Sequence, residues 1–76
     1  MLTGKKFRLN RETVAIETLE DVRTVLVVPV GEVVTVLRGP TAEDKRMVDV
    51  RWADRTLVMF AEDIQNRGSE ASEQAA

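Results

Sequence analysis

Seventy-six residues are enough for one domain. The chain has no cysteine and no histidine, which excludes disulfides, thiolate chemistry and the commonest metal sites, so we expect neither a metal nor a cofactor. The formal net charge of −2 lacks the basic excess that is typical of nucleic-acid-binding domains. A domain of this size is marginally stable alone, so it depends on a compact core, assisted by self-association.

The N-terminal residues are positively charged, but no apolar run follows them, so the sequence predicts no signal peptide. The longest apolar run, residues 25–30, is far too short to span a bilayer and contains Pro29. We therefore expect a cytoplasmic protein that makes no membrane contact.

The N-terminal part of the chain shows two short alternating patterns. Residues 5–10 alternate between polar and apolar side chains, which predicts a half-buried strand. Residues 13–18 place Val14 and Ile16 on a common face, and they form either a second strand or a continuation of the first strand past a bulge. Residues 19–22 are rich in polar side chains and predict a turn, with a short helical turn as the alternative.

Residues 25–38 hold the densest β-branched content, and the rest of the chain is expected to pack on them. They predict two strands, at 24–28 and 33–37, joined by a tight turn at residues 29–31. Both strands are apolar on both faces, so periodicity does not decide which face is buried. Such strands are normally covered on both sides, either within the fold or by a partner subunit.

The C-terminal half continues this pattern. Residues 38–46 predict a charged loop, and the turn-forming dipeptide Gly39-Pro40 lies near its start. Residues 47–52 alternate most cleanly, with both valines and the tryptophan on one side, and residues 55–60 form the returning strand. Residues 61–67 suit one helical turn, and residues 68–76 lack large apolar side chains and are expected to be disordered. The sequence thus predicts an all-β domain over residues 1–67, with five to six short strands and one terminal helical turn.

The strand order and turn residues resemble the SH3-like small β-barrels of bacteria. The chain is similar to short bacterial proteins of uncharacterised function that carry the pattern P-x-G-x-x-V…V-x-V-x-W…V-x-F-x-x-D-[LI]-x-x-R. The resemblance covers residues 7–67 and implies an SH3-like barrel, without implying an activity. The matching positions are Pro29, Gly31, Val34, Val48, Val50, Trp52, Val58, Phe60, Asp63, Ile64 and Arg67.

The polar side chains do not predict catalysis. The carboxylates at positions 49, 54, 62 and 63 have no histidine, cysteine or ordered serine with which to complete a site. The expected function of Asp63 is local, either capping the terminal turn or pairing with Arg67 four residues later. We therefore expect a non-enzymatic protein.

The apolar strands carry the main functional hypothesis, because a small barrel buries only one face of most strands. Apolar side chains left outside form a patch that binds a protein partner or a second copy of the chain. Trp52 is either an anchor for such a partner or a plug at the end of the barrel. The expected partner-binding residues are Val25, Val27, Val33, Trp52 and Val58.

A cluster of basic residues near the N-terminus supports an alternative hypothesis. Lys5, Lys6, Arg8 and Arg11 could bind phosphates, which would make the protein a nucleic-acid-binding small barrel. The simpler interpretation is a solvated strand face whose charges discourage edge-to-edge aggregation. The shortage of aromatic side chains for base stacking favours that interpretation.

Overall fold

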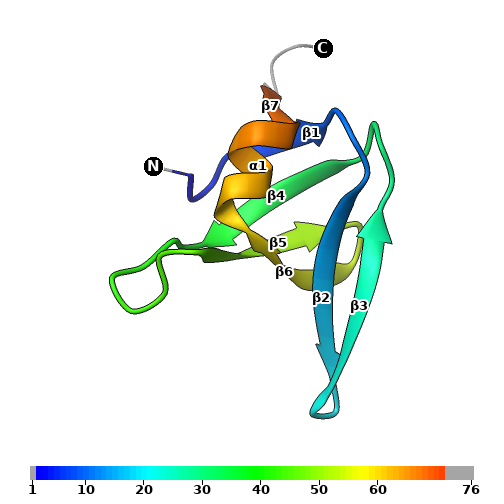
Figure 1. The fold of residues 1–76 in the computed structure, drawn as a ribbon, viewed down its shortest axis with the longest axis vertical. Coiled ribbons are helices and arrows are strands. Elements are labelled where there is room, and N and C mark those ends of the chain that lie inside the picture. Colours follow the sequence, from blue (N-terminus) through cyan, green and yellow to red (C-terminus); the bar gives the residue numbers. More distant parts are fainter. Residues whose placement is uncertain (1, 72–76) are drawn as a thin grey trace.

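One curled antiparallel sheet and one short helix make up residues 2–71, which are the residues that the computed structural model describes (Figure 1). The predicted all-β class is confirmed. In chain order the elements are β1 (Lys6–Leu9), β2 (Thr13–Leu19), β3 (Val22–Val28), β4 (Val33–Arg38), β5 (Met47–Trp52), β6 (Arg55–Phe60), α1 (Ala61–Arg67) and β7 (Gly68–Ala71).

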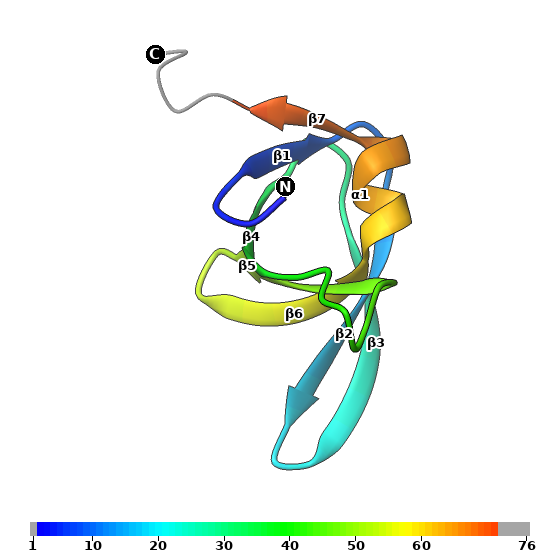
Figure 2. The same ribbon diagram turned by 90° about the vertical axis from the view of Figure 1, so that its left-hand side faces the viewer.

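The sheet curls without closing. Its strands lie in the order β3-β2-β6-β5-β4-β1-β7, and the two terminal strands, β3 and β7, are not paired with each other. Figures 1 and 2 show β1, β4, β5 and β6 curving around a common interior that α1 covers, while the β2–β3 hairpin extends away from this body. The curvature agrees with a small barrel, but the open ends of the sheet mean that a closed barrel is not confirmed.

Strand alternation decides which side chains form the core. Every second residue of β4, β5 and β6 is buried, and these side chains meet Ile64 from α1 and two residues from β1. Trp52 lies on the same side of β5 as the buried valines and packs against the core, as the alternation predicts. The buried residues of the four strands are Phe7, Leu9, Val34, Val36, Val48, Val50, Leu57 and Met59.

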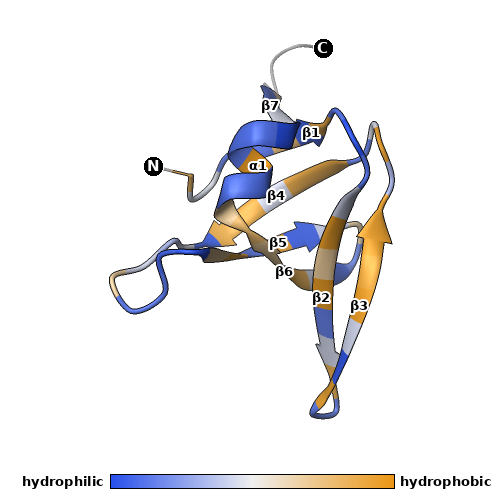
Figure 3. Cartoon of the chain, viewed as in Figure 1, coloured by the Kyte–Doolittle hydropathy of each residue, from blue (hydrophilic) through white to orange (hydrophobic). Residues whose placement is uncertain are grey.

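The structure also answers which face of β3 points inward. Val28 is fully buried and Leu26 packs partly against the core, whereas Val25 and Val27 point to the opposite side. Figure 3 shows apolar residues along most of β3, out on the extended hairpin. Apolar side chains therefore occupy both faces of this strand, and only one of those faces contributes to the core.

β2 and β3 form a hairpin with a two-residue turn at Glu20 and Asp21. Both residues have positive φ, 51° and 66°, which corresponds to a type I′ turn. Residue pairing runs without a break from Thr13–Val28 to Leu19–Val22. The segment 13–19 is thus a separate strand. The prediction of a turn at residues 19–22 is confirmed, and the alternative of a short helical turn is wrong.

Residues 29–32 do not join two paired strands, which differs from the prediction. β3 and β4 are not neighbours in the sheet, so this segment crosses from one part of the sheet to another. Gly31 has a φ of 89°, which its lack of a side chain permits. Its N–H donates to the carbonyl of Leu9 at 2.8 Å, and the Leu9 N–H donates to the carbonyl of Glu32 at 2.9 Å. These bonds fasten the crossover to the end of β1.

The C-terminal segment confirms the predicted helical turn, but the ordered fold continues beyond residue 67, where the disordered tail was expected to begin. α1 buries Ala61 and Ile64, as the predicted turn over residues 61–67 requires. Residues 68–71, expected to begin a disordered tail, instead form β7, which pairs with β1 from Leu9–Gly68 to Lys6–Ala71. The rest of the predicted tail, residues 72–76, lies outside the described residues.

Candidate interaction surface

The outward side of the β2–β3 hairpin is apolar. Val14 pairs with Val27 and Ile16 pairs with Val25 across the two strands, and all four side chains point away from the buried Ala15 and Val28. Val25 is 68% exposed, Val27 51% and Val14 42%. We call these four residues, Val14, Ile16, Val25 and Val27, the valine face.

The strand register extends this face across the sheet. Ile16 pairs with Val58 in β6, Val58 with Asp49 in β5, and Asp49 with Arg38 in β4. Residues that are directly opposite in a sheet share a face. One row of side chains therefore runs from the apolar edge strand β3, through half-buried Val58 in β6, to the charged pair of Asp49 in β5 and Arg38 in β4.

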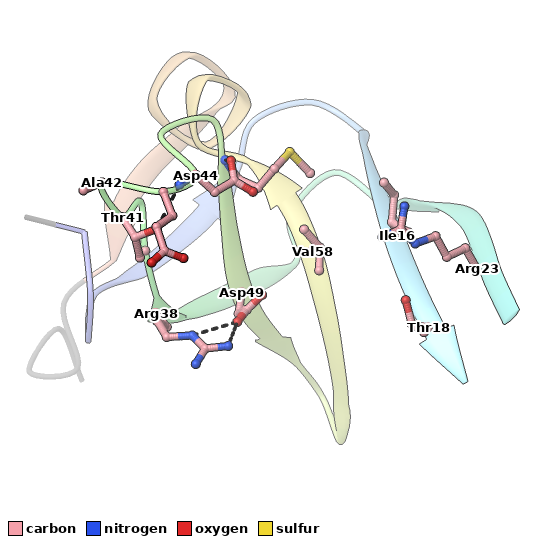
Figure 4. A pocket seen from close by; sticks show the side chains of 12 residues that line it. Ile16, Thr18, Arg23, Arg38, Thr41, Ala42, Asp44, Asp49 and Val58 are labelled. Carbon is pink, nitrogen blue, oxygen red and sulfur yellow. Dashed lines mark hydrogen bonds and ion pairs between the residues drawn. The ribbon is translucent and has the colours of Figure 1, made fainter. Parts of the chain in front are cut away.

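A groove of about 990 Å³ follows this row between the hairpin and the loop of residues 39–46 (Figure 4). Ile16 and Val58 provide its apolar part, and Arg23 lies on the hairpin side. On the opposite side Arg38 donates from Nε and Nη2 to Asp49 Oδ2, at 3.1 and 2.8 Å. The groove thus joins an apolar wall to a charged one.

Hydrogen bonds within the loop shape the charged wall. The Asp44 N–H donates to Thr41 Oγ1 at 3.0 Å, and Asp44 Oδ1 accepts from the backbone N–H groups of Arg46 and Met47, both at 3.2 Å. The carboxylate of Asp44 is therefore engaged in holding the loop. Arg38 compensates Asp49, whereas Glu43 and Asp44 add two further carboxylates, so this wall is polar and net acidic.

The five predicted partner-binding residues separate into two groups. Val25 and Val27 belong to the valine face, and Val58 continues it. Val33 lies on β4 opposite Arg8 and is only partly exposed. The Trp52 ring packs against the core, and its Nε1–H donates to Glu32 Oε1 at 2.8 Å. Three of the five residues are thus brought together.

Trp52 also takes part in a polar chain that connects β5 and β6 to β2. The guanidinium of Arg55 lies 5.6 Å from the centre of the Trp52 ring, a cation–π distance. Arg55 Nε donates to Glu17 Oε2 at 2.9 Å, and its Nη2 donates to the other carboxylate oxygen. This bond from Arg55 lowers the pKa of the buried Glu17 below its ordinary value. The same contact raises the pKa of Arg55. These contacts hold the Trp52 ring in place, so its function is structural.

The basic residues are divided between two sides of β1. Lys5 forms an ion pair with Glu70 at 3.5 Å. Lys6 and Arg8 point outward, and the pairing Lys6–Thr35–Arg51 places Arg51 on the same side of the sheet. Arg11 is exposed in the connection between β1 and β2.

The register thus joins Lys6, Arg8 and Arg51 on one surface, which we call the basic face. The sequence did not suggest Arg51, because only the β1–β4–β5 pairing connects it to the N-terminal cluster.

Asp63 has one of the two local functions predicted for it. Asp63 and Arg67 are 3.9 Å apart at the i, i+4 spacing, so the ion-pair prediction is confirmed. The α1 N-terminus has no side-chain cap hydrogen bond. Between residues 2 and 71 no three histidine, cysteine, aspartate or glutamate side chains are grouped closely enough to hold a metal ion.

No helix among the described residues is long and apolar enough to cross a membrane. No family model, curated protein or solved structure matches this chain. The valine face, the groove beside it and the basic face are therefore the features from which a function can be inferred.

Proposed function

We propose that this protein is a non-enzymatic assembly module, which binds a protein partner or a second copy of itself through the valine face. The observation that supports this function is the pair of apolar cross-strand contacts, Val14–Val27 and Ile16–Val25, on the side of the hairpin opposite to the core. Exposed apolar patches of this kind mark interaction sites on soluble proteins.

The energetic reason is the cost of leaving these side chains in water. Fully burying one valine or isoleucine side chain is worth about 1.5–3 kcal/mol. The inward side of the hairpin already supplies Ala15 and Val28 to the core, and the hairpin extends beyond the body that could cover its other side (Figure 1). A binding partner would remove this exposed area from water.

Sedimentation velocity over a wide concentration range tests the function with wild-type protein and two variants. Val27→Lys places a charge in the valine face, and we expect it to weaken association about tenfold or more, which corresponds to about 1.4 kcal/mol. Val30→Lys is the matched control, since Val30 is also a valine, is 61% exposed and lies outside the face. Association that is equally strong in wild type and Val27→Lys would show that the valine face is not the binding surface.

The basic face supports a second candidate, a nucleic-acid-binding module. Lys6, Arg8 and Arg51 share one side of the sheet, although the total charge of −2 opposes binding to phosphates. We expect only weak binding of short duplex and single-stranded DNA at low salt. A dissociation constant below about 1 μM that rises steeply with salt and is lost in Arg51→Glu would favour this candidate instead.

The SH3-like barrel and the cytoplasmic location remain parts of the same proposal. The curled sheet and the helical turn between β6 and β7 support the barrel assignment. An experimental structure that superposes poorly on SH3-like barrels would refute it.

A further inference from the structure

We infer that the partner is a second copy of this chain. The β3 strands of the two copies pair with each other in antiparallel orientation along their open edges, which places the two valine faces side by side. This inference rests on the proposed function and specifies the occupant and the register. It starts from the position of β3, which is the terminal strand of the sheet and pairs only with β2 among the described residues.

The hairpin register identifies the backbone groups that point away from β2. In a two-residue type I′ hairpin the residues that flank the turn, here Leu19 and Val22, form a hydrogen-bonded pair, and such pairs recur at every second position. The even-numbered residues of β3 therefore bond to β2, whereas the N–H and C=O groups of Arg23, Val25 and Val27 point to the open edge.

Pro29 follows the same alternation. It falls on the open-edge side, where its missing N–H removes no bond to β2. Within residues 2–71 no other strand pairs with this edge of β3, which ends at a proline.

This edge has few of the features that normally prevent strands from pairing. Sheets protect their edges with charged side chains, above all lysine, and with prolines, bulges or very short strands. β3 has seven residues, a single charged residue, Arg23, and no internal proline, and its pairing with β2 shows no register shift. The opposite edge differs, because β7 has four residues and carries Glu70 in an ion pair with Lys5. The β3 edge is thus the more favourable of the two for pairing.

The edge is self-complementary. When two copies of β3 overlap completely in antiparallel orientation, Val25 lies opposite Val25 of the second copy on the two-fold axis, and Arg23 lies opposite Val27. Each open-edge N–H then meets a C=O of the other copy. The two Arg23 side chains are separated by about 14 Å at a rise of about 3.4 Å per residue. That separation exceeds the Debye length of about 10 Å at 0.1 M salt, so like charges do not oppose the pairing.

The same arrangement covers part of Val25, the most exposed residue of the valine face, because Val25 contacts its own counterpart at the axis. The valine faces of the two copies then form one continuous surface. Two short strands form a small interface, below the about 1,200 Å² of a standard complex, so we expect a dimer that dissociates on dilution.

Single-cysteine variants test the register, because the natural chain has no cysteine. Opposite residues of a hydrogen-bonded antiparallel pair have Cα atoms about 5.5 Å apart, within the about 4.4–6.8 Å range of disulfides. Val25→Cys should therefore form covalent dimers on mild oxidation or with dibromobimane, a short thiol-specific cross-linker.

Val22→Cys is the matched control, since Val22 is a valine of the same strand and is 62% exposed. In the proposed register its two copies lie about 20 Å apart. We expect at least about tenfold more cross-linked dimer from Val25→Cys than from Val22→Cys, with both variants dimeric in sedimentation.

The outcomes separate the two levels of the proposal. A dimer that cross-links equally at both positions, or at position 22 alone, would overturn the β3 register while the assembly function stands. A monomer at every concentration would overturn the second copy as occupant. Dimerisation that is insensitive to Val27→Lys would instead overturn the valine face as the binding surface.

Discussion

A buried valine of β5 and an exposed valine of the β2–β3 hairpin predict unequal losses of stability for the same substitution, Val→Ala. Val50 is fully buried in β5, and the change removes two methyl groups from the core. At about 0.8 kcal/mol for each buried carbon, the transfer term is about 1.6 kcal/mol. The cavity left behind adds to this, so we expect Val50→Ala to cost about 2–3 kcal/mol. Val25 is 68% exposed, so Val25→Ala should cost only about 0.5 kcal/mol in the monomer.

Urea denaturation measures both values, with fluorescence of Trp52 as the probe because it is the only tryptophan. The total stability expected for a chain of this size is about 4–11 kcal/mol, so Val50→Ala removes a large share of it. Its melting temperature should fall by about 10–20 °C. The protein is kept dilute, since association would add a concentration-dependent cost to Val25→Ala. Equal losses at the two positions in dilute solution would contradict the assignment of inward and outward faces.

Three further predictions concern the remaining contacts of the fold. Because Arg55 lowers the pKa of Glu17 below the ordinary 4.5, ionised Glu17 stabilises the folded state above that pH, and this contribution is lost as the pH falls through the lowered pKa. Glu17→Gln should therefore melt below wild type at pH 7, with the difference shrinking below about pH 4.5; a difference that stays constant with pH would exclude the ion pair as its cause. Gly68→Ala should destabilise the protein by about 1–3 kcal/mol, because a Cβ there would lie 2.7 Å from the carbonyl oxygen of Ile64; an unchanged melting temperature would contradict this close approach. Deleting residues 69–76 removes three residues of β7 and their pairing with β1, so it should lower the melting temperature measurably, and unchanged stability would show that β7 adds nothing to the fold.

Alternation was the most informative signal in the sequence. It located the strand at 47–52 with Val48 and Val50 inward, and it separated Val25 and Val27 from Leu26 and Val28. Alternation describes one strand at a time, so it does not reveal which strands are neighbours. The pairing of Val58 with Ile16 follows from the sheet order and could not be predicted.

Turn chemistry misled the prediction at one place. Pro29 and Gly31 suggested a tight turn between paired strands, but residues 29–32 cross the sheet instead. The turn between β2 and β3 was predicted at the right place, although Glu20 and Asp21 lack the glycine usually found where φ is positive. The strand β7 was missed because its sequence, Gly-Ser-Glu-Ala, has no β-branched residue and forms a strand only by pairing with β1.

The charged contacts of the site depend on distances along the chain that no local pattern encodes. Arg38 and Asp49 meet because β4 and β5 pair, and Glu17 meets Arg55 across 38 positions. Arg51 joins the basic face for the same reason. The apolar content of the candidate site was therefore predictable, whereas its polar components were not.

The junction between β2 and β6 has a mechanical consequence. Among the residues that the structure describes, Ile16 and Val58 are the one pair along it, and the Glu17–Arg55 ion pair also spans it. Few bonds therefore join the hairpin to the body along this seam, and protonation of Glu17 in acid removes one of them. The attachment of the hairpin thus depends on the charge of a carboxylate at its base.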